Sequence, residues 1–243
     1  MKKKLFLSLT FFLLISFSLY AKNKNNSTDS LNIIPIPYQV TLVACDIYAK
    51  DMLNGYLDIR ESKPYLTRHK QLMNVLKTQK AYDVNLEQYY LEGYTIMYNY
   101  YKKYPTKDRY DLTYRILLFS NMKCFKDLSN KYLKIDYNKK IEFGLFNCYV
   151  NSSIKNIGYK AGEQHLTPEQ THKMLVNHLR ERIGGTDDII NKFIDTYYKL
   201  IQLGIDMYKS NPNLNTENYV KEIVIHFDMP CIYGELLSYF KKK

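Results

Sequence analysis

The segment that decides the fold class runs from residue 88 to residue 105 and reads QYYLEGYTIMYNYYKKYP. Its tyrosine, leucine, isoleucine and methionine residues recur on nearly every side of a helix, which leaves little room for a solvent-facing side. Pro105 ends the helix, because proline has no N–H to donate and disfavours helical geometry in the residue before it. Helices of this kind usually occupy the centre of a bundle, so we expect a central helix from about Asn85 to Tyr104.

The segments on either side also have helical patterns, and none alternates with a period of two for long enough to predict a sheet. We therefore predict an all-α fold, a multi-helix bundle of about seven to nine helices. The other expected helices cover approximately residues 39–57, 64–82, 107–132, 138–154, 168–183, 187–210 and 216–228, with a short terminal helix after Pro230.

Several of these boundaries depend on single residues. Thr167 and Gln170 flank Pro168 and can form a capping box, which predicts a helix start at Pro168. Gly158 and Gly162 are expected in a loop, and Pro230 is expected to interrupt the last helix. The segment 187–210 is as apolar as the segment 88–105, so we expect it to be central as well.

The same two segments share a double tyrosine and end before a proline, about 107 residues apart. Such a match can indicate a repeat of helical hairpins, as in solenoid proteins. Because the two segments align over only about 16 positions, chance is the better explanation.

The chain begins with the pattern of a secretory signal peptide. Lys2, Lys3 and Lys4 precede an uncharged apolar run from Leu5 to Tyr20, and Ala21 follows at a plausible cleavage position. We predict a signal peptide over residues 1–21, a flexible polar lead-in over 22–37 and a single helical domain over 38–243. An uncleaved N-terminal anchor is the alternative.

This leader predicts export to the periplasm or the extracellular space. No later segment reaches about 18 uninterrupted apolar residues, so no transmembrane segment is expected in the mature chain.

The chain is basic, with 35 Lys and Arg against 24 Asp and Glu and a net charge of +11. A basic exported protein can attract an acidic partner, such as another protein or an acidic envelope polymer. The composition, which is rich in Tyr, Asn, Ile and Lys and lacks Trp, favours nucleotide bias in an AT-rich genome as the cause. Nucleic-acid binding fits poorly, because arginine is scarce and no binding motif is present.

The four cysteines are Cys45, Cys124, Cys148 and Cys231, and their even number in an exported chain predicts two disulfides. Three connectivities are possible. We predict Cys124 with Cys148, joining neighbouring helices, and Cys45 with Cys231, joining the first helix to the last. Buried free thiols are the alternative. No C-x-x-C pair indicates a zinc or redox site.

The candidate binding residues are the tyrosines of the central helix at helical spacing, Tyr90, Tyr94, Tyr98 and Tyr101. Phenol rings stack on sugars and offer hydroxyl groups, although tyrosine also serves as an ordinary core residue. Solvent exposure distinguishes the two interpretations.

Catalytic signals are weak. No metal or cofactor motif is present, so we predict neither, and no G-x-S-x-G elbow occurs. Cleavage of cell-wall glycan requires a carboxyl group held in an apolar cleft, and Glu142, beside Phe143 and Gly144, is the candidate. An exposed helix residue is the ordinary alternative.

The carboxyl end carries Lys209-Ser210-Asn211-Pro212 and Phe227-Asp228-Met229-Pro230-Cys231. This ending resembles that of small helical periplasmic immunity proteins, which neutralise cell-wall amidase toxins, with Cys148 and Tyr149 in the place of an early Cys and Tyr. The glycine-rich turn and the middle Cys of that family are missing here. The resemblance implies an inhibitor of a toxin.

These patterns favour an exported helical protein that binds another macromolecule, without catalysis, over an enzyme. A periplasmic immunity or inhibitor protein and a cell-wall peptidoglycan hydrolase are the alternatives.

Overall fold

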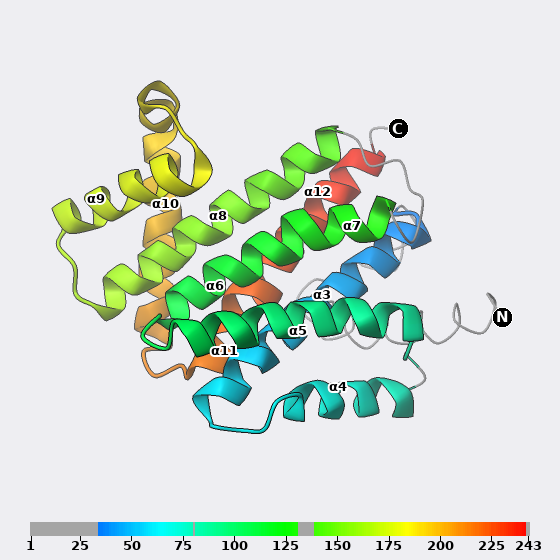
Figure 1. The fold of residues 1–243 in the computed structure, drawn as a ribbon. Helices are drawn as coiled ribbons and strands as arrows, with labels where there is room; N and C mark the ends of the chain where they lie inside the picture. The colour runs from blue at the N-terminus through cyan, green and yellow to red at the C-terminus, as the bar shows by residue number, and fades with distance from the viewer. Residues whose placement is uncertain (1–33, 80, 131–138, 242–243) are drawn as a thin grey trace.

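A computed structural model describes residues 34–79, 81–130 and 139–241 of the chain, and these residues form helices and no strand (Figure 1). The prediction of an all-α multi-helix fold is confirmed. The predicted signal peptide and most of the predicted lead-in lie outside the described residues. The first described helix begins at Ile36, so Pro37 belongs to its first turn and not to a lead-in.

Eight continuous helices account for the described secondary structure, because several of the elements follow one another without a break. The elements are α3 (Ile36–Arg60), α4 (Thr67–Thr78), α5 (Val84–Lys103), α6 (Arg109–Leu117), η1 (Leu118–Cys124), α7 (Phe125–Leu128), α8 (Lys139–Glu163), α9 (Pro168–His178), η3 (Leu179–Ile183), α10 (Asp187–Ser210), α11 (Thr216–Lys221), η4 (Glu222–Asp228) and α12 (Met229–Lys241). Within the three η elements the helix widens to π geometry.

The order of elements in the first half of the chain is repeated in the second half. A 25-residue helix (α3 or α8) is followed by a short helix (α4 or α9), a long helix (α5 or α10) and a composite helix (α6–η1–α7 or α11–η4–α12). In each half the first helix packs most extensively against the third. The chain is therefore a tandem of two four-helix units, which we call repeat 1 and repeat 2, joined by one continuous hydrophobic core.

Corresponding residues lie at corresponding places in the two repeats. Cys45 and Gly55 are ten residues apart in α3, as Cys148 and Gly158 are in α8. The composite helices begin alike, since Asp108 and Asn215 each cap the helix start through the side chain, three residues after a proline. Attributing the match between the two segments to chance was therefore wrong.

The two long helices of each repeat cross with their backbones in contact. A Cβ atom on Gly158 would overlap the carbonyl oxygen of Ile201 in α10, and one on Gly55 would overlap that of Tyr94 in α5. Gly158 consequently lies inside α8, which runs on to Glu163, and the predicted loop at Gly158 and Gly162 does not exist. The glycine marks a close crossing here and not the end of a helix.

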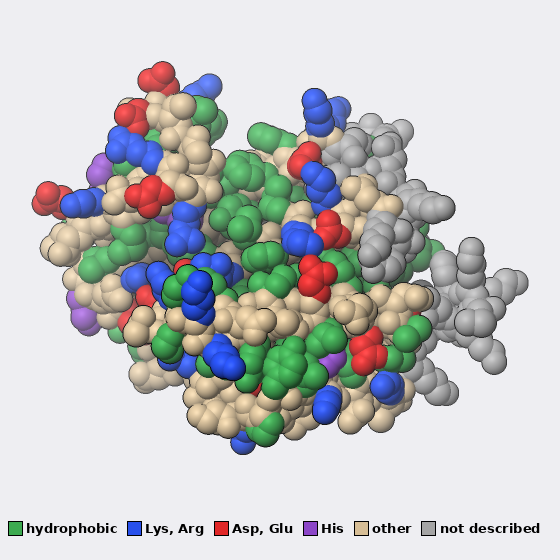
Figure 2. All heavy atoms as spheres, in the orientation of Figure 1, with side chains coloured by type: hydrophobic (Ala, Val, Ile, Leu, Met, Phe, Trp, Pro, Cys, Tyr) green, Lys and Arg blue, Asp and Glu red, His purple; other side chains and the backbone are tan. Residues whose placement is uncertain are grey.

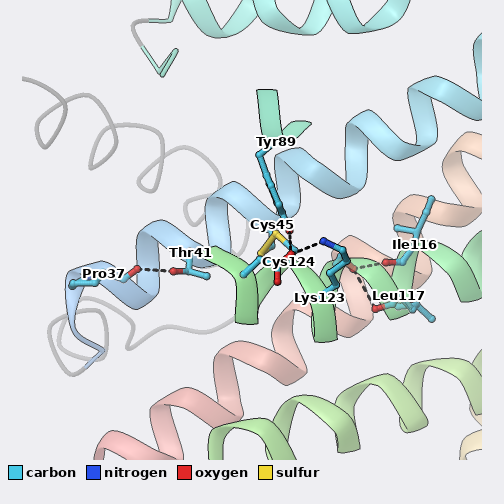
Figure 3. The surroundings of a disulfide bond; sticks show 10 residues. Pro37, Thr41, Cys45, Tyr89, Ile116, Leu117, Lys123 and Cys124 are labelled. Carbon is cyan, nitrogen blue, oxygen red and sulfur yellow. Dashed lines mark hydrogen bonds and ion pairs between the residues drawn. A yellow bond between two sulfur atoms is a disulfide. The ribbon is translucent and has the colours of Figure 1, made fainter. Parts of the chain in front are cut away.

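Each disulfide joins the first and the fourth helix of one repeat. Cys45 of α3 pairs with Cys124 at the end of η1 (Figure 3), and Cys148 of α8 pairs with Cys231 of α12. The two disulfides are confirmed but the predicted connectivity was wrong, because it assumed that helices adjacent in sequence are the ones to be joined. Each bond closes a long loop and contributes about 4–5 kcal/mol on the chain-entropy model.

Pro230 does not interrupt the last helix. The wide turns of η4 end at Asp228, and α12 starts at Met229 with Pro230 in its first turn. The helix is continuous here, and the proline, which has no N–H to donate, lies directly after turns whose hydrogen-bond pattern is already widened. The capping box predicted at Thr167 and Gln170 is present at the start of α9.

The junction between the repeats is built around one arginine. Arg109, at the start of α6, donates hydrogen bonds to Glu163 at the end of α8 and to the carbonyl oxygen of Leu214, the latter at 2.6 Å. Its guanidinium group lies 4.8 Å from the ring centre of Tyr219 in α11. This planar cation, held between aromatic rings and a carboxylate, links α6 of repeat 1 to α8 and α11 of repeat 2.

The short helix of repeat 1, α4, is held by a buried ion-pair cluster. Asp58 is fully buried and accepts hydrogen bonds from the Tyr94 hydroxyl at 2.7 Å and from the backbone and guanidinium of Arg68. Next to it, the Asp51 carboxylate lies 2.6 Å from Nδ1 of His69. Burial raises the pKa of Asp51, and the hydrogen bond with His69 opposes that rise.

None of the described helices combines the length and the hydropathy that a membrane crossing requires.

The close crossing can be tested with two glycines of different surroundings. Gly158→Ala is expected to lower the free energy of unfolding by about 2–3 kcal/mol, because the helices must separate to admit a methyl group. Gly234→Ala is the matched control, since a Cβ atom added at this position of α12 would have no atom within 4 Å, and it is expected to raise stability by about 0.5–1 kcal/mol. Urea unfolding measures both, and equal effects would contradict the close crossing.

Asp58 and Glu61 bind the same arginine and differ in burial, which isolates the contribution of the buried cluster. Asp58→Ala leaves the Tyr94 hydroxyl and the backbone N–H of Arg68 without their acceptor, and it is expected to lower the free energy of unfolding by about 3–5 kcal/mol. The side chain of Glu61 is 44% exposed. Glu61→Ala is therefore expected to lower the free energy of unfolding by less than about 1 kcal/mol. Thermal or urea unfolding of the two variants checks the difference.

Candidate binding surface

The tyrosines predicted to bind a ligand lie mainly in the core. Tyr90, Tyr94 and Tyr101 are at most 3% exposed, and Tyr98 is half-buried. The hydroxyl of Tyr94 donates to Asp58 and that of Tyr101 donates to Asp111. The stripe is therefore part of the packing of α5 against its neighbours, and it lines no open concave surface.

Glu142, the candidate catalytic acid, lies on the outside of α8. Its side chain is 42% exposed and one carboxylate oxygen is 3.7 Å from Nζ of Lys126 in α7. A small apolar cavity lies elsewhere, between Leu53, Ile116 and Val224. With a volume of about 10 Å³ it has room for about one water molecule. Glu142 is thus an ion-paired surface residue and not a carboxyl group in an apolar cleft.

Among the described residues, no group of three or more His, Cys, Asp or Glu side chains is arranged to hold a metal ion.

A different set of residues forms an apolar surface on the face shown in Figure 2. Hydrophobic side chains gather there between α8 and the α6–η1 helix. Phe143 of α8 is 65% exposed and Leu118 of η1 is 44% exposed. Half-buried or buried aromatic rings of the same two helices complete the set, which we call the α8–η1 surface: Tyr114, Leu118, Phe143, Phe146 and Tyr149.

The two helices that carry this surface come from different repeats and are each held by a disulfide. Cys124 ends η1 and is bonded to α3, and Cys148 lies within α8 and is bonded to α12. Both cysteines are fully buried beneath the surface helices. The α8–η1 surface is therefore presented on a rigid support, which reduces the entropy lost when a partner binds.

Charged residues mark the two ends of the surface. At one end the guanidinium of Arg182 lies 5.2 Å from the ring centre of Tyr114 and 3.8 Å from an oxygen of Asp111. At the other end Lys126 faces Glu142 across α7 and α8. An apolar centre with a polar, charged margin is typical of protein-binding surfaces.

His178 supports the ring of Tyr114 from below. The two rings stack with centres 4.7 Å apart, and Nε2 of His178 is buried without a hydrogen-bond partner. Burial, together with the nearby Arg182, lowers the pKa of His178 from 6.5 to about 4. The imidazole is therefore neutral at ordinary pH and acts as an aromatic support.

No protein-family model, curated protein or solved structure matches this chain. The resemblance of the carboxyl end to periplasmic immunity proteins accordingly has no support from these comparisons.

The sequence carries no signal for the α8–η1 surface. Phe143 follows Glu142 in a predicted helix, and Leu118 is one apolar residue among many in another. A surface made by two helices from different repeats has no periodic signature in the sequence, because periodicity describes the faces of one helix at a time.

The pKa of His178 predicts an acid-sensitive contribution to stability. Between pH 6.5 and about 4 the unfolded chain binds a proton that the folded chain does not, so the free energy of unfolding falls by about 3 kcal/mol over that range. His178→Phe keeps a ring against Tyr114 and removes this contribution. Urea unfolding measures the decrease in the free energy of unfolding between pH 7 and pH 4. This decrease should be about 3 kcal/mol smaller in His178→Phe than in the unaltered protein.

His226→Gln is the control for this prediction, because His226 is exposed. His226→Gln should lose as much free energy of unfolding between pH 7 and pH 4 as the unaltered protein does. If His178→Phe also loses as much as the unaltered protein, then burial does not oppose the protonation of His178.

Proposed function

We propose that the protein is exported and binds another protein through the α8–η1 surface, without carrying out chemistry on it. The observation that supports this function most is the exposure of Phe143 and Leu118 on two helices that pack against each other and are each held by a disulfide. Burying a large aromatic side chain stabilises a complex by about 1.5–3 kcal/mol, and aromatic anchors dominate the energetics of many interfaces.

Export is supported by the leader over residues 1–21 and by the two disulfides. Disulfides persist in oxidising compartments such as the periplasm and the extracellular space. The described cysteines are all paired.

The surface indicates the chemistry of the partner. An aliphatic or aromatic side chain of the partner would lie between Phe143 and Leu118, and a carboxylate would face Arg182, whose side chain is 46% exposed. An acidic envelope polymer, the other predicted partner, would instead bind through scattered lysines with little use of the apolar centre. Its binding would weaken steeply with salt, whereas apolar contact is much less sensitive to salt.

One observation favours the more specific function of an immunity or inhibitor protein. The two cysteines that carry the resemblance, Cys148 and Cys231, form one disulfide within repeat 2, a four-helix unit over residues 139–241. The residues that precede the match form repeat 1, a second unit of the same architecture. No corresponding observation favours a peptidoglycan hydrolase, because Glu142 is exposed and paired with Lys126.

A photo-crosslinking amino acid at position 143 tests the proposed function in producing cells. Val84, at the start of α5, is the matched control position, because it is 67% exposed and Phe143 is 65% exposed. We expect one stoichiometric protein adduct from position 143 and none from position 84, identified by mass spectrometry.

A second substitution ties the adduct to the surface. Leu118→Asp should reduce the yield of the adduct by about tenfold or more, since loss of an interface anchor costs about 2 kcal/mol. Equal adducts from positions 143 and 84, or none from position 143, would refute binding through this surface. An adduct with an exported toxin would identify the inhibitor function.

A further inference from the structure

The long helix of repeat 2, α10, is not central to the bundle as its sequence predicted. Only Ile190, Ile201 and Gly204 of α10 are buried, and Ile201 and Gly204 contact α8. Figure 1 shows α10 crossing behind α8 at the side of the molecule away from α3 and α5. A large part of its apolar surface is therefore open to solvent.

The exposed apolar residues of α10 follow a regular spacing. Ile189, Phe193 and Leu203 are 49%, 45% and 49% exposed, and Leu200 and Met207 are half-buried. Together with Thr196 they are separated by alternate steps of four and three residues: Ile189, Phe193, Thr196, Leu200, Leu203 and Met207. This is the heptad spacing of a helix that packs against a second helix in a coiled coil. We call these six residues the α10 seam.

We propose that the α10 seam binds the α10 seam of a second copy of this chain, in an antiparallel pair with a two-fold axis at the level of Tyr198. In this arrangement the same surface is used by both copies, as a closed dimer requires. The seam is symmetric about that level, so every residue faces a residue of the seam: Ile189 faces Met207 of the second copy, Phe193 faces Leu203, and Thr196 faces Leu200.

The charges beside the seam are self-complementary in this register. Lys192 and Asp206 flank it on the same side of the helix, seven residues on either side of Lys199. The antiparallel pairing brings Lys192 of one copy beside Asp206 of the other, twice per dimer. Lys199 meets its own copy near the axis, which is one unfavourable contact against two favourable ones. Flanking charges of this kind select the partner and the orientation of paired helices.

In repeat 1 one position of the corresponding face is covered by an aromatic ring from the first helix of the same repeat. The carbonyl contacts of Gly55 and Gly158 align Tyr94 of α5 with Ile201 of α10. In that alignment Thr196 corresponds to Tyr89, which is buried and stacks on the ring of Tyr48 at 4.8 Å. The position of α8 that corresponds to Tyr48 is Asn151, a side chain too short to cover α10. A second copy supplies the missing cover.

This inference is independent of the function proposed for the α8–η1 surface, because the α10 seam involves none of its residues.

Sedimentation equilibrium of the disulfide-bonded protein over a wide concentration range tests the proposed dimer. The unaltered protein should show a reversible monomer–dimer equilibrium. Phe193→Glu should weaken dimerisation by at least about tenfold, since it places a charge in the apolar seam. Asn191→Glu is the matched control, with the same charge change two residues away on the outer face of α10, and should leave the dimer unchanged.

A charge exchange tests the orientation. Lys192→Asp should weaken the dimer by about tenfold, and the double variant Lys192→Asp, Asp206→Lys should restore it to within about threefold. A monomer at every concentration would overturn the proposal, and so would a dimer that Phe193→Glu leaves intact. A double variant as weak as the single one would overturn the antiparallel register. Circular dichroism of each variant separates these outcomes from loss of folding.

Discussion

Direct contact between helix backbones, at one glycine in the first helix of each repeat, is the constraint on which the rest of the structure depends. Gly55 lets α3 approach α5, and Gly158 lets α8 approach α10, to a separation that no Cβ atom would permit. These two pairs are the most extensive helix contacts among the described residues. The composite helix of each repeat packs against the first helix of that repeat and is fixed to it by a disulfide.

Equivalent positions of the two repeats hold different side chains, and these differences decide which surfaces of each repeat are covered. Repeat 1 fills the flank of its close pair with Tyr48 and Tyr89 and holds α4 through the buried carboxylates of Asp51 and Asp58. Repeat 2 has Asn151 where repeat 1 has Tyr48, and its third helix keeps an apolar seam in contact with solvent.

The two apolar surfaces differ in what supports them. The α8–η1 surface joins the repeats, is anchored by both disulfides and lies above a neutral, buried histidine, so its shape is fixed before any partner arrives. The α10 seam lies on one peripheral helix whose pattern matches itself in the reverse direction. The α8–η1 surface is suited to a different protein whose shape complements it. The α10 seam is suited to a second copy of the same chain.

The sequence by itself determined the features that depend on neighbouring residues. Pro105 ended α5, Thr167 and Gln170 capped α9, and the absence of any alternation with a period of two excluded a sheet from the expected fold. Such signals work because hydrogen bonds of a helix turn and its cap lie within four residues of one another. The tyrosine pattern of residues 88–105 likewise identified a helix whose rings are largely buried.

Only the tertiary structure decided which cysteines pair, whether a glycine ends a helix or marks a crossing, and which apolar residues face solvent. Glycine and proline usually end helices, yet Gly158 and Pro230 both lie within helices. The close neighbour α10 requires a glycine at position 158, and the widened turns of η4 accommodate Pro230. The sequence of 187–210 is apolar enough for a central helix, but α10 lies at the margin, since burial depends on how many other helices remain to cover it. The cysteine pairing and the helix crossings depend on groups about 40 to 80 residues apart along the chain, and their meeting is a property of the whole packing arrangement and not of any local pattern.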